Sequence, residues 1–387
     1  MDRFVFELSV LFVGAAVLSY AAVLLRQPII VAYVACGVLL GPWGAGWIRQ
    51  VDFIDAVSRL GITLLLFLAG LCLHPQKLVR VFRKAFPVAA GNCLFSFVLA
   101  FTFARLFGFG RLECLVIGLA MMFSSTILVV KLLPTTRLHH GHMGAVCIGV
   151  LILEDLLAVV VLAFLRCLGV PGGAAWNFGI VLFKLAGFLV ALFLFEQYVL
   201  RRAMQRAERL HEILFVLGLA WCFGVAGISN RMGLFYETGA FFAGVVLARH
   251  PVSLFISERL KPLRDFFLVL FFVALGAQMN LRVMREIWFA CALLAALICV
   301  VKPWFLKHLF LYAKEEAAFS KEAGLRLGQL SEFSLLIALL ALQLGRISSL
   351  ASQFIQLVTL LTFVFSSYRV VFRYPTPIGP SEKLNRD

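Results

Sequence analysis

The stretch MGAVCIGVLILEDLLAVVVLAFL, residues 143–165, places two neighbouring acids, Glu154 and Asp155, in the middle of an otherwise apolar run. A run of this length can span a bilayer as a helix, since about 20 apolar residues cross the hydrocarbon core. A charged side chain at mid-bilayer costs roughly 2.5–3.5 kcal/mol on insertion scales, so acids inside a membrane mark candidate functional sites. This segment therefore predicts the class of fold and the place of its chemistry.

The composition of the whole chain agrees with a membrane protein. Hydrophobic residues make up 62% of the 387 residues, charged residues 14%, and the mean hydropathy is +0.99. Soluble domains contain roughly 45–50% apolar and about 25% charged residues. The chain has too little polar surface to cover a water-facing globule, which excludes a soluble enzyme. No nucleophile–base pair or metal-ligand set appears apart from a loop of histidines, so we expect no enzymatic activity and no cofactor.

The charge balance is strongly basic, with 35 Lys and Arg residues against 20 Asp and Glu residues. In a soluble protein this balance would indicate a nucleic-acid partner, but cytoplasmic loops of membrane proteins are themselves rich in Lys and Arg. We therefore expect a lipid bilayer and no nucleic acid. The nine cysteines form no Cys-x-x-Cys pair and lie mostly in apolar runs, so we expect small buried residues without a disulfide framework or zinc site.

Apolar runs between charged residues and Gly or Pro breaks predict an all-α polytopic membrane protein of about 13 transmembrane helices. The predicted spans are 4–24, 28–47, 56–73, 86–108, 112–133, 143–168, 176–200, 211–228, 234–249, 262–280, 287–313, 324–344 and 350–372. The first is interpreted as a retained span, because a mixed-charge pair precedes it and no small-residue cleavage site follows. A transmembrane domain of residues 1–373 would then precede a short cytoplasmic tail, residues 374–387.

Loop charge predicts the orientation. An odd number of spans places the two termini on opposite sides of the membrane. With the N-terminus outside, the inward loops hold about twice as many Lys and Arg residues as the outward loops, in line with the cytoplasmic excess of these residues. We expect a protein of the cell inner (plasma) membrane with an outside N-terminus and a cytoplasmic C-terminus.

The two acids of the sixth span fit a binding site for a proton and a small cation. Burial favours the neutral form of a carboxylic acid, whereas a bound cation or a nearby Lys favours the ionised form. Helix neighbours point about 100° apart, so we expect Asp155 to be the main ligand, with Glu154 beside it. The alternative is structural: one acid forms an ion pair, the other a helix–helix hydrogen bond, and nothing is transported.

Lys302 lies deep in the predicted eleventh span, directly before Pro303, which favours a kink. We expect Lys302 to be the counter-charge of Glu154 or Asp155. A Lys that reaches towards the inner interface is the alternative.

Polar residues interrupt two further spans, one in each half of the chain. They are Ser124, Ser125 and Thr126 in the fifth span and Gln329, Ser331 and Glu332 in the twelfth. Broken helices near the bilayer midplane offer helix ends and free carbonyl groups to ions. The two interrupted spans therefore predict an ion-binding site in the middle of the membrane. Hydroxyls that only pack between helices are the alternative for the fifth span.

Three histidines, His139, His140 and His142, lie together in a predicted inward loop. They could sense cytoplasmic pH, because histidine titrates near neutrality. A solvated loop without such a role is the simpler interpretation.

Two short motifs of the first half of the chain also have similar counterparts in the second half. ACGVLLG (35–41) resembles FAGVVLA (242–248), and LLLFLAGLCL (64–73) resembles VLFFVALGAQM (269–279). Both pairs are separated by about 205 residues and keep their order. With an odd number of spans between the copies, the repeats, approximately 28–200 and 234–372, would be inverted, as is common in secondary transporters.

An ordered set of motifs resembles a known family. The segments are RQPIIVAYVACGVLLGPWG (26–44), LGITLLLFLAGLCLHPQKL (60–78), FSSTILVVKLL (123–133), GVLILEDLLAVVVL (149–162), TGAFFAGVVLAR (238–249), LFFVALGAQMNL (270–281) and GQLSEFSLLIALL (328–340). Together they extend over residues 26–345. They resemble the Kef-type monovalent cation:proton antiporters, the antiporter-2 branch of the sodium/proton exchanger superfamily.

The resemblance implies a secondary antiporter that exchanges K⁺ or Na⁺ for H⁺ by alternating access. It further implies an inverted-repeat fold in which an elevator-like core moves against a dimerisation scaffold, in a homodimer. It assigns the exchanged ion to Asp155, places the two helix breaks beside it as crossing helices, and puts Lys302 where relatives with paired acids carry a Lys.

The chain departs from the family in three ways. It has Glu154-Asp155 where potassium-type relatives usually have Gln-Asp and electrogenic sodium exchangers have Asp-Asp, so two acids face one Lys, which favours electrogenic exchange. It carries SLFISERLKPLRDFF (253–267) in place of the acidic gating stretch. The nucleotide-binding regulatory region of many relatives is not found after about residue 373, so gating by a glutathione-type ligand is not expected.

Two other classes of transport protein fit parts of this pattern. A gated potassium efflux channel would line a pore with the same acids. An organic-anion transporter on the related inverted-repeat fold would not need the intramembrane acid for proton coupling.

The predicted orientation can be tested by cysteine accessibility in a background without the native cysteines. Arg206→Cys lies in a predicted inward segment and Arg346→Cys in a predicted outward loop. We expect a membrane-impermeant thiol reagent to label Arg346→Cys in intact cells and Arg206→Cys only after permeabilisation. The reverse pattern would contradict the orientation.

Overall fold

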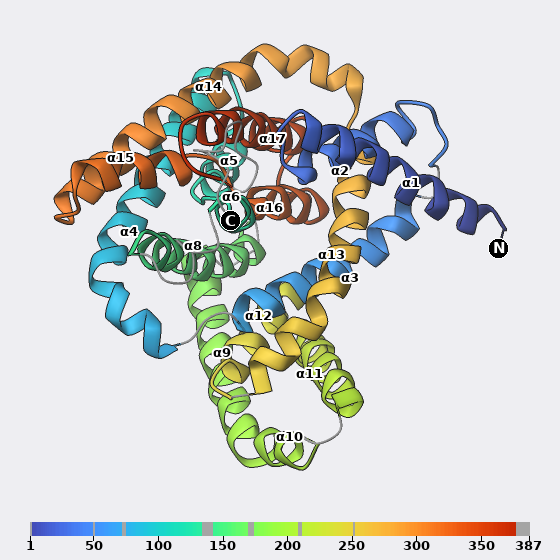
Figure 1. Cartoon of the computed structure of the whole chain (residues 1–387), viewed down its shortest axis with the longest axis vertical. Helices are drawn as coiled ribbons and strands as arrows, with labels where there is room; N and C mark the ends of the chain where they lie inside the picture. The colour runs from blue at the N-terminus through green and yellow to red at the C-terminus, as the bar shows by residue number, and fades with distance from the viewer. Residues whose placement is uncertain are drawn as a thin grey trace. The chain divides into compact units, whose positions relative to one another are not determined.

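The computed structural model describes residues 2–48, 51–71, 75–133, 142–168, 174–207, 211–250 and 252–376. In this described part every regular element is helical, as the sequence predicts (Figure 1). The elements are α1 (Asp2–Leu24), α2 (Ile29–Leu40), α3 (Val51–Leu71), α4 (Pro75–Leu106), α5 (Arg111–Ala120), α6 (Thr126–Leu132), α8 (His142–Cys167), α9 (Ala174–Phe195), the π-helical turn η1 (Glu196–Leu200), α10 (Arg201–Ala207), α11 (His211–Arg231), α12 (Tyr236–Leu247), α13 (Val252–Gln278), α14 (Leu281–Tyr312), α15 (Ala317–Arg326), α16 (Glu332–Gln343) and α17 (Ser349–Val371).

Several of these helices are long enough to span a membrane. Within the described residues, seven helical stretches are long and apolar enough to cross a bilayer: Val5–Leu24, Ala85–Leu106, His142–Cys167, Trp176–Met204, Ile213–Arg231, Leu281–Tyr312 and Ser349–Val371. Four shorter apolar helices, Ile29–Leu40, Leu60–Leu71, Tyr236–Leu247 and Glu332–Gln343, lie in other predicted spans. The all-α polytopic class is confirmed, and the count of 13 crossings stays a prediction.

The chain forms two compact units. One unit consists of Ser9–Trp47, Arg80–Ala158 and Gly276–Asp387, and we call it the acid-bearing unit because it holds Glu154 and Asp155. The other consists of Met1–Leu8, Ile48–Val79 and Val159–Leu275.

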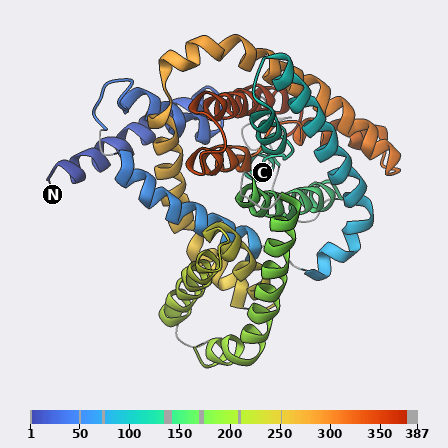
Figure 2. The ribbon, with the colours of Figure 1, turned by 180° about the vertical axis from the view of Figure 1, so that it is seen from behind.

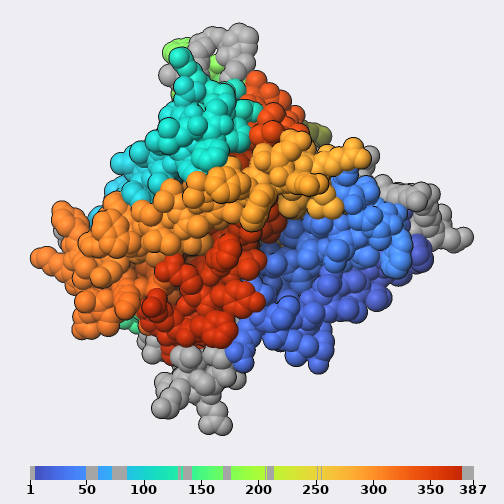
Figure 3. Space-filling view, turned by 90° about the horizontal axis from the view of Figure 1, so that it is seen from above, coloured from blue at the N-terminus to red at the C-terminus, as the bar shows by residue number. Residues whose placement is uncertain are grey.

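Within the acid-bearing unit, α14 packs against α15 and α17, and α16 packs against α5 and α17. The latter pairing can be followed from both sides of the ribbon (Figures 1 and 2). In the space-filling view, α14 and α17 lie side by side across one face (Figure 3). These helices surround the two segments in which helical structure is interrupted.

Both interruptions occur where the sequence predicts them. Helix α5 ends at Ala120 and α6 begins at Thr126, with Ser125 as N-cap residue whose hydroxyl accepts a hydrogen bond from the Leu128 N–H (3.1 Å). Helix α15 ends at Arg326 and α16 begins at Glu332, with Ser331 as N-cap accepting from the Phe333 N–H (3.2 Å). The serines satisfy N–H groups that a helix start leaves without a partner, which stabilises a new start at each place.

The motifs that are similar between the two halves of the chain contact each other in the fold: each motif of the first half packs against the other motif of the second half. Helix α12, with the FAGVVLA motif, contacts α3, with the LLLFLAGL motif: a Cβ atom on Gly244 would lie 2.1 Å from the carbonyl oxygen of Phe67. In the acid-bearing unit, a Cβ atom on Gly276 at the end of α13 would lie 2.1 Å from the carbonyl oxygen of Val34 in α2. Each motif of one half thus meets the other motif of the second half, through a backbone contact that glycine permits.

The α3–α12 contact yields a stability prediction. We expect Gly244→Ala to destabilise the folded protein by about 1–3 kcal/mol, because the methyl group overlaps backbone atoms of α3. Gly224→Ala in α11 is the matched control, since no atom of the described residues outside the neighbouring backbone of its own helix lies within 4 Å of the position that its added Cβ would take. Thermal unfolding of the purified proteins in detergent measures both; equal melting temperatures would contradict the close contact.

Candidate functional site

Helix α8 carries Glu154 and Asp155 into the interior of the acid-bearing unit. The exposed fraction of Glu154 is 0% and that of Asp155 is 5%. Buried carboxyl groups require hydrogen bonds or a neighbouring cation, because water no longer solvates them. The two acids have different hydrogen-bonding partners, and each carboxyl group is therefore left with a different capacity to bind another ligand.

Both oxygens of Glu154 accept short hydrogen bonds. Its Oε1 accepts from Nδ2 of Asn92 in α4 (2.7 Å), and its Oε2 accepts from the backbone N–H of Ser124 (2.7 Å). Ser124 belongs to the interruption between α5 and α6, so Glu154 fixes that segment against α8. The fully buried Asn92 is not among the site residues predicted from the sequence, although an amide within an apolar run is a usable signal.

Lys302 in α14 is fully buried and joins the two interruptions. Its ammonium donates to the carbonyl oxygens of Phe123 (3.1 Å) and Gln329 (3.1 Å). It also interacts electrostatically with Glu154, but no hydrogen bond or ion pair between these two residues is present in the described part of the chain. A counter-charge role for Lys302 therefore stays a prediction, and the contacts identify it as a support for both helix breaks.

Helix α14 continues as a helix through Pro303. A proline lacks the N–H that would bond to the carbonyl four residues earlier, here that of Cys299. Nη1 of Arg369 in α17 donates to this carbonyl oxygen instead. The freed backbone acceptor beside Lys302 is thus satisfied by a neighbouring helix.

Asp155 has one hydrogen-bonding partner among the described residues. The hydroxyl of Thr126, the first residue of α6, lies 3.2 Å from Oδ2 and 3.4 Å from Oδ1. The carboxyl group also interacts electrostatically with Glu154 and with Glu332. A carboxylate can accept about four hydrogen bonds, so Asp155 keeps most of its capacity for another ligand.

Glu332 begins α16 and faces the same turn of α6. Its Oε1 accepts from the backbone N–H of Ile127 at 3.4 Å, and the residue is 8% exposed. The hydroxyls of Ser125 and Ser331, which cap α6 and α16, lie near the same carboxyl group. An acidic residue in the first turn of a helix is favoured by the helix dipole.

The second interruption is held by α17. Ser366 donates to Oε1 of Gln329 (3.1 Å), and the hydroxyl of Thr362 accepts from the Leu330 N–H (3.2 Å). The sequence predicts Gln329 and Ser331 at this break but does not single out Thr362 and Ser366. Hydroxyl residues in the otherwise apolar last span are the signal that would have found them.

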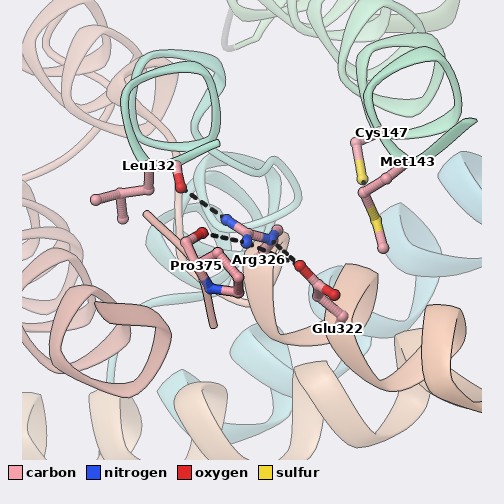
Figure 4. Close-up of polar contacts among 6 residues, drawn as sticks. All are labelled: Leu132, Met143, Cys147, Glu322, Arg326 and Pro375. Atoms are coloured by element: carbon pink, nitrogen blue, oxygen red, sulfur yellow. Dashed lines mark hydrogen bonds and ion pairs between the residues drawn. The ribbon is translucent and has the colours of Figure 1, made fainter. Parts of the chain in front are cut away.

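A buried arginine links the C-terminal ends of α6 and α15 (Figure 4). The guanidinium of Arg326, 2% exposed at the end of α15, donates to Glu322, to the Leu132 carbonyl at the end of α6 (2.8 Å) and to the Pro375 carbonyl after α17 (3.0 Å). Burial, with the carboxylate of Glu322 adding to it, raises the pKa of the neighbouring Tyr374 phenol. Arg326 therefore stabilises the C-terminal ends of α6 and α15 together.

Of the three predicted loop histidines, His139 and His140 lie outside the described residues. His142 begins α8, and its Nε2 lies 2.7 Å from Oε2 of Glu315 in the α14–α15 connection. This contact involves neither Asp155 nor its partners, so a pH-sensing role for the histidines stays a prediction.

No group of three or more His, Cys, Asp and Glu residues in the described part of the chain could hold a metal ion. The buried oxygens around Asp155 come from carboxyl, hydroxyl and backbone groups. Such hard oxygen ligands suit cations that do not require nitrogen or sulfur.

The sodium/hydrogen exchanger transmembrane family model matches residues 8–371, nearly the whole chain. The chain belongs to the sodium/hydrogen exchanger family. Membership makes it a multi-pass membrane transporter and not an enzyme, and cation/proton antiport is the activity that this family supports.

Relatives and a solved structure agree with this family. The chain is 27% identical to the iron transporter MagA of Paramagnetospirillum magneticum, over 92% of this chain and 83% of that protein. It is 27% identical to K(+) efflux antiporter 4 of Arabidopsis thaliana, over 90% of this chain but only 60% of the plant protein. The sodium proton antiporter MjNhaP1 of Methanocaldococcus jannaschii has the same fold, with a TM-score of 0.72 at 15% identity, covering 95% of this chain and 96% of that one.

The contacts of Lys302 yield a prediction for this exchanger. Lys302→Met leaves the carbonyls of Phe123 and Gln329 without their buried donor, so we expect a loss of about 2–5 kcal/mol in stability, since each unsatisfied buried polar group costs about 1–3 kcal/mol. Lys307→Met, at a partly exposed position of the same helix, is the control. Thermal unfolding in detergent measures the difference; an unchanged melting temperature for Lys302→Met would show that neither break depends on the ammonium.

Proposed function

We propose that this exchanger moves a monovalent cation, K⁺ or Na⁺, in one direction and H⁺ in the other, and that the two compete for the carboxyl group of Asp155. The observation that carries the proposal is the unequal bonding of the two acids of α8. Glu154 accepts two hydrogen bonds of 2.7 Å, whereas Asp155 receives one hydroxyl, that of Thr126. Of these two acids, Asp155 therefore retains more lone pairs for a proton or a metal ion.

Competition follows from the chemistry of a buried carboxyl group. The neutral acid binds the proton covalently and has little attraction for a cation, whereas the ionised acid needs a nearby positive charge. One group thus serves both substrates in turn, and the binding of one releases the other. Exchange results when the group faces each side of the membrane alternately.

Alternating access by a moving core is supported by the two interrupted helices. Half-helices that meet beside a buried ligand are the pattern by which secondary transporters expose a midplane site first to one side and then to the other. The reciprocal contacts of α2 with α13 and of α3 with α12 favour the inverted repeats 28–200 and 234–372. We further propose an elevator-type movement against a scaffold, a homodimer, and a position in the cell inner (plasma) membrane with the N-terminus outside.

The choice of a monovalent cation rests on the ligand types. The relative named an iron transporter raises a divalent or trivalent metal as a question, but the described residues hold no cluster of His, Cys, Asp and Glu for such an ion. The relative named a K(+) efflux antiporter and the fold shared with a sodium proton antiporter favour an alkali cation.

The experiment that tests the proposal uses the purified chain in liposomes with a pH-sensitive dye inside. We expect an imposed K⁺ or Na⁺ gradient to drive protons in the opposite direction. A gated cation channel would dissipate the cation gradient without coupled proton movement, and an organic-anion transporter would leave the proton signal unaffected by either cation. Either result would overturn the proposal.

Asp155 provides the decisive variant. Asp155→Asn keeps a side chain of nearly the same size but cannot ionise, so we expect coupled exchange to fall to the background of empty liposomes. Asp265→Asn is the matched control, because Asp265 is exposed and pairs with its neighbour Arg264. Retained exchange in folded Asp155→Asn, judged by its melting temperature and elution profile, would refute Asp155 as the carrier.

A further inference from the structure

Three acids of the described residues lie buried around the helix breaks, and only Glu154 accepts a short hydrogen bond from a different donor at each oxygen. Glu154 accepts from Asn92 and Ser124 at 2.7 Å through its two oxygens. These bonds hold α4, α8 and the α5–α6 interruption together. Glu154 thus has a sufficient structural reason to be present, because each of its oxygens already bonds to a different segment of the protein.

Glu332 has the opposite pattern. Its Oε1 accepts a long bond, 3.4 Å, from the Ile127 N–H, and the Ser125 and Ser331 hydroxyls lie near the same carboxyl group, but its Oε2 is buried without a hydrogen-bond partner among the described residues. A buried acceptor without a partner costs about 1–3 kcal/mol, and more if it is charged. A structural acid would be expected to have both oxygens bonded, so the free oxygen of Glu332 points to a ligand that the protein itself does not supply.

The fold brings Glu332 to Asp155. Consecutive residues of the first turn of α6 contact the two acids: the Thr126 hydroxyl bonds to Asp155 and the Ile127 N–H bonds to Glu332. The two carboxyl groups are close enough to interact electrostatically. Asp155 comes from α8 and Glu332 from α16, so two helices far apart in sequence place their acids at one turn of a third.

Other unpartnered oxygens lie at the same two breaks. The hydroxyls of Ser124 and Ser334 are buried and have no hydrogen-bond partner in the described part of the chain. Ser124 precedes Thr126 by two residues and Ser334 follows Glu332 by two. Oxygens without an internal partner are thus found both in the α5–α6 interruption and in the first turn of α16.

We infer that Glu332 is a cation ligand and that the transported ion binds between Asp155 and Glu332, with the Thr126 hydroxyl as a third oxygen. This inference rests on the proposed exchange function and deepens it. The second carboxylate of the site is then Glu332 from α16, and Glu154, the neighbour of Asp155 in sequence, is a structural acid. An ion at this position contacts both broken helices, so its binding and release act directly on the two segments that would have to move.

The test compares Glu332→Gln with the wild-type chain in the liposome assay at one fixed pH. We expect the KM for Na⁺ or K⁺ to rise about tenfold or more, because the amide replaces a charged ligand with a neutral one. Glu286→Gln, at an exposed position of α14, is the control and should keep the wild-type KM. A wild-type KM for Glu332→Gln would overturn the inference.

A binding measurement separates a ligand from a merely structural residue. A cation that binds only the folded protein raises its melting temperature, and the rise grows with the concentration of the cation relative to its Kd. We expect Glu332→Gln to need about tenfold more Na⁺ or K⁺ than the wild-type chain for the same rise. We also expect Glu154→Gln to lower the melting temperature without cation more than Glu332→Gln does; the reverse order of these two losses would assign the structural role to Glu332 and overturn the inference.

If Glu332→Gln does not fold, Glu332→Asp is the variant to test. It keeps the carboxyl group but places it one methylene group farther from the proposed ion. A changed order of KM values among Li⁺, Na⁺, K⁺ and Rb⁺ would support the inference, and an unchanged order with unchanged KM values would overturn it. Wild-type liposomes without any cation-coupled proton movement would instead refute the proposed function. The two failures are thus distinguished by the wild-type measurement.

Discussion

The ammonium of Lys302 is the interaction on which the site depends. It is fully buried and donates to the carbonyl oxygens of Phe123 and Gln329, one in each interruption. Backbone groups freed by a broken helix are tolerated inside a membrane protein only where other groups satisfy them. By bonding to a carbonyl in each break, one side chain holds both interruptions to α14, and Glu154 of α8 lies within range of its charge.

The surrounding contacts divide the candidate site into a part bonded on all sides to the protein and the part that we propose accepts the ion. Asn92, Thr362, Ser366 and Arg369 bond to the backbone or side chains of the breaks and of α14. Glu154 belongs to this first part through its bond to the Ser124 N–H. Among the described residues Asp155 accepts from a single hydroxyl and Glu332 keeps one oxygen without a partner, which is the property expected of groups that must hold and release an ion.

Much of the site was accessible from the sequence because polar residues in apolar runs are conspicuous. Glu154, Asp155 and Lys302 are charged residues inside predicted spans, and the interruptions at Ser124–Thr126 and Gln329–Glu332 follow from polar residues that cap or break helices. The supporting residues were not found for a physical reason. Asn92, Thr362 and Ser366 are visible in the sequence as polar residues in apolar runs, but such residues often bond only to their own helix, and nothing local distinguishes the ones that reach across.

The sequence by itself determined that the chain is an all-helical membrane protein, where its helices break, and which residues carry buried charge, because hydropathy and capping are local properties. Only the tertiary structure decided which acid faces which partner. Glu154 and Asp155 are adjacent and chemically alike, yet one meets Asn92 and the Ser124 N–H while the other meets Thr126 and Glu332. That difference arises from residues in distant parts of the chain, brought together by packing, which no local pattern of residues specifies.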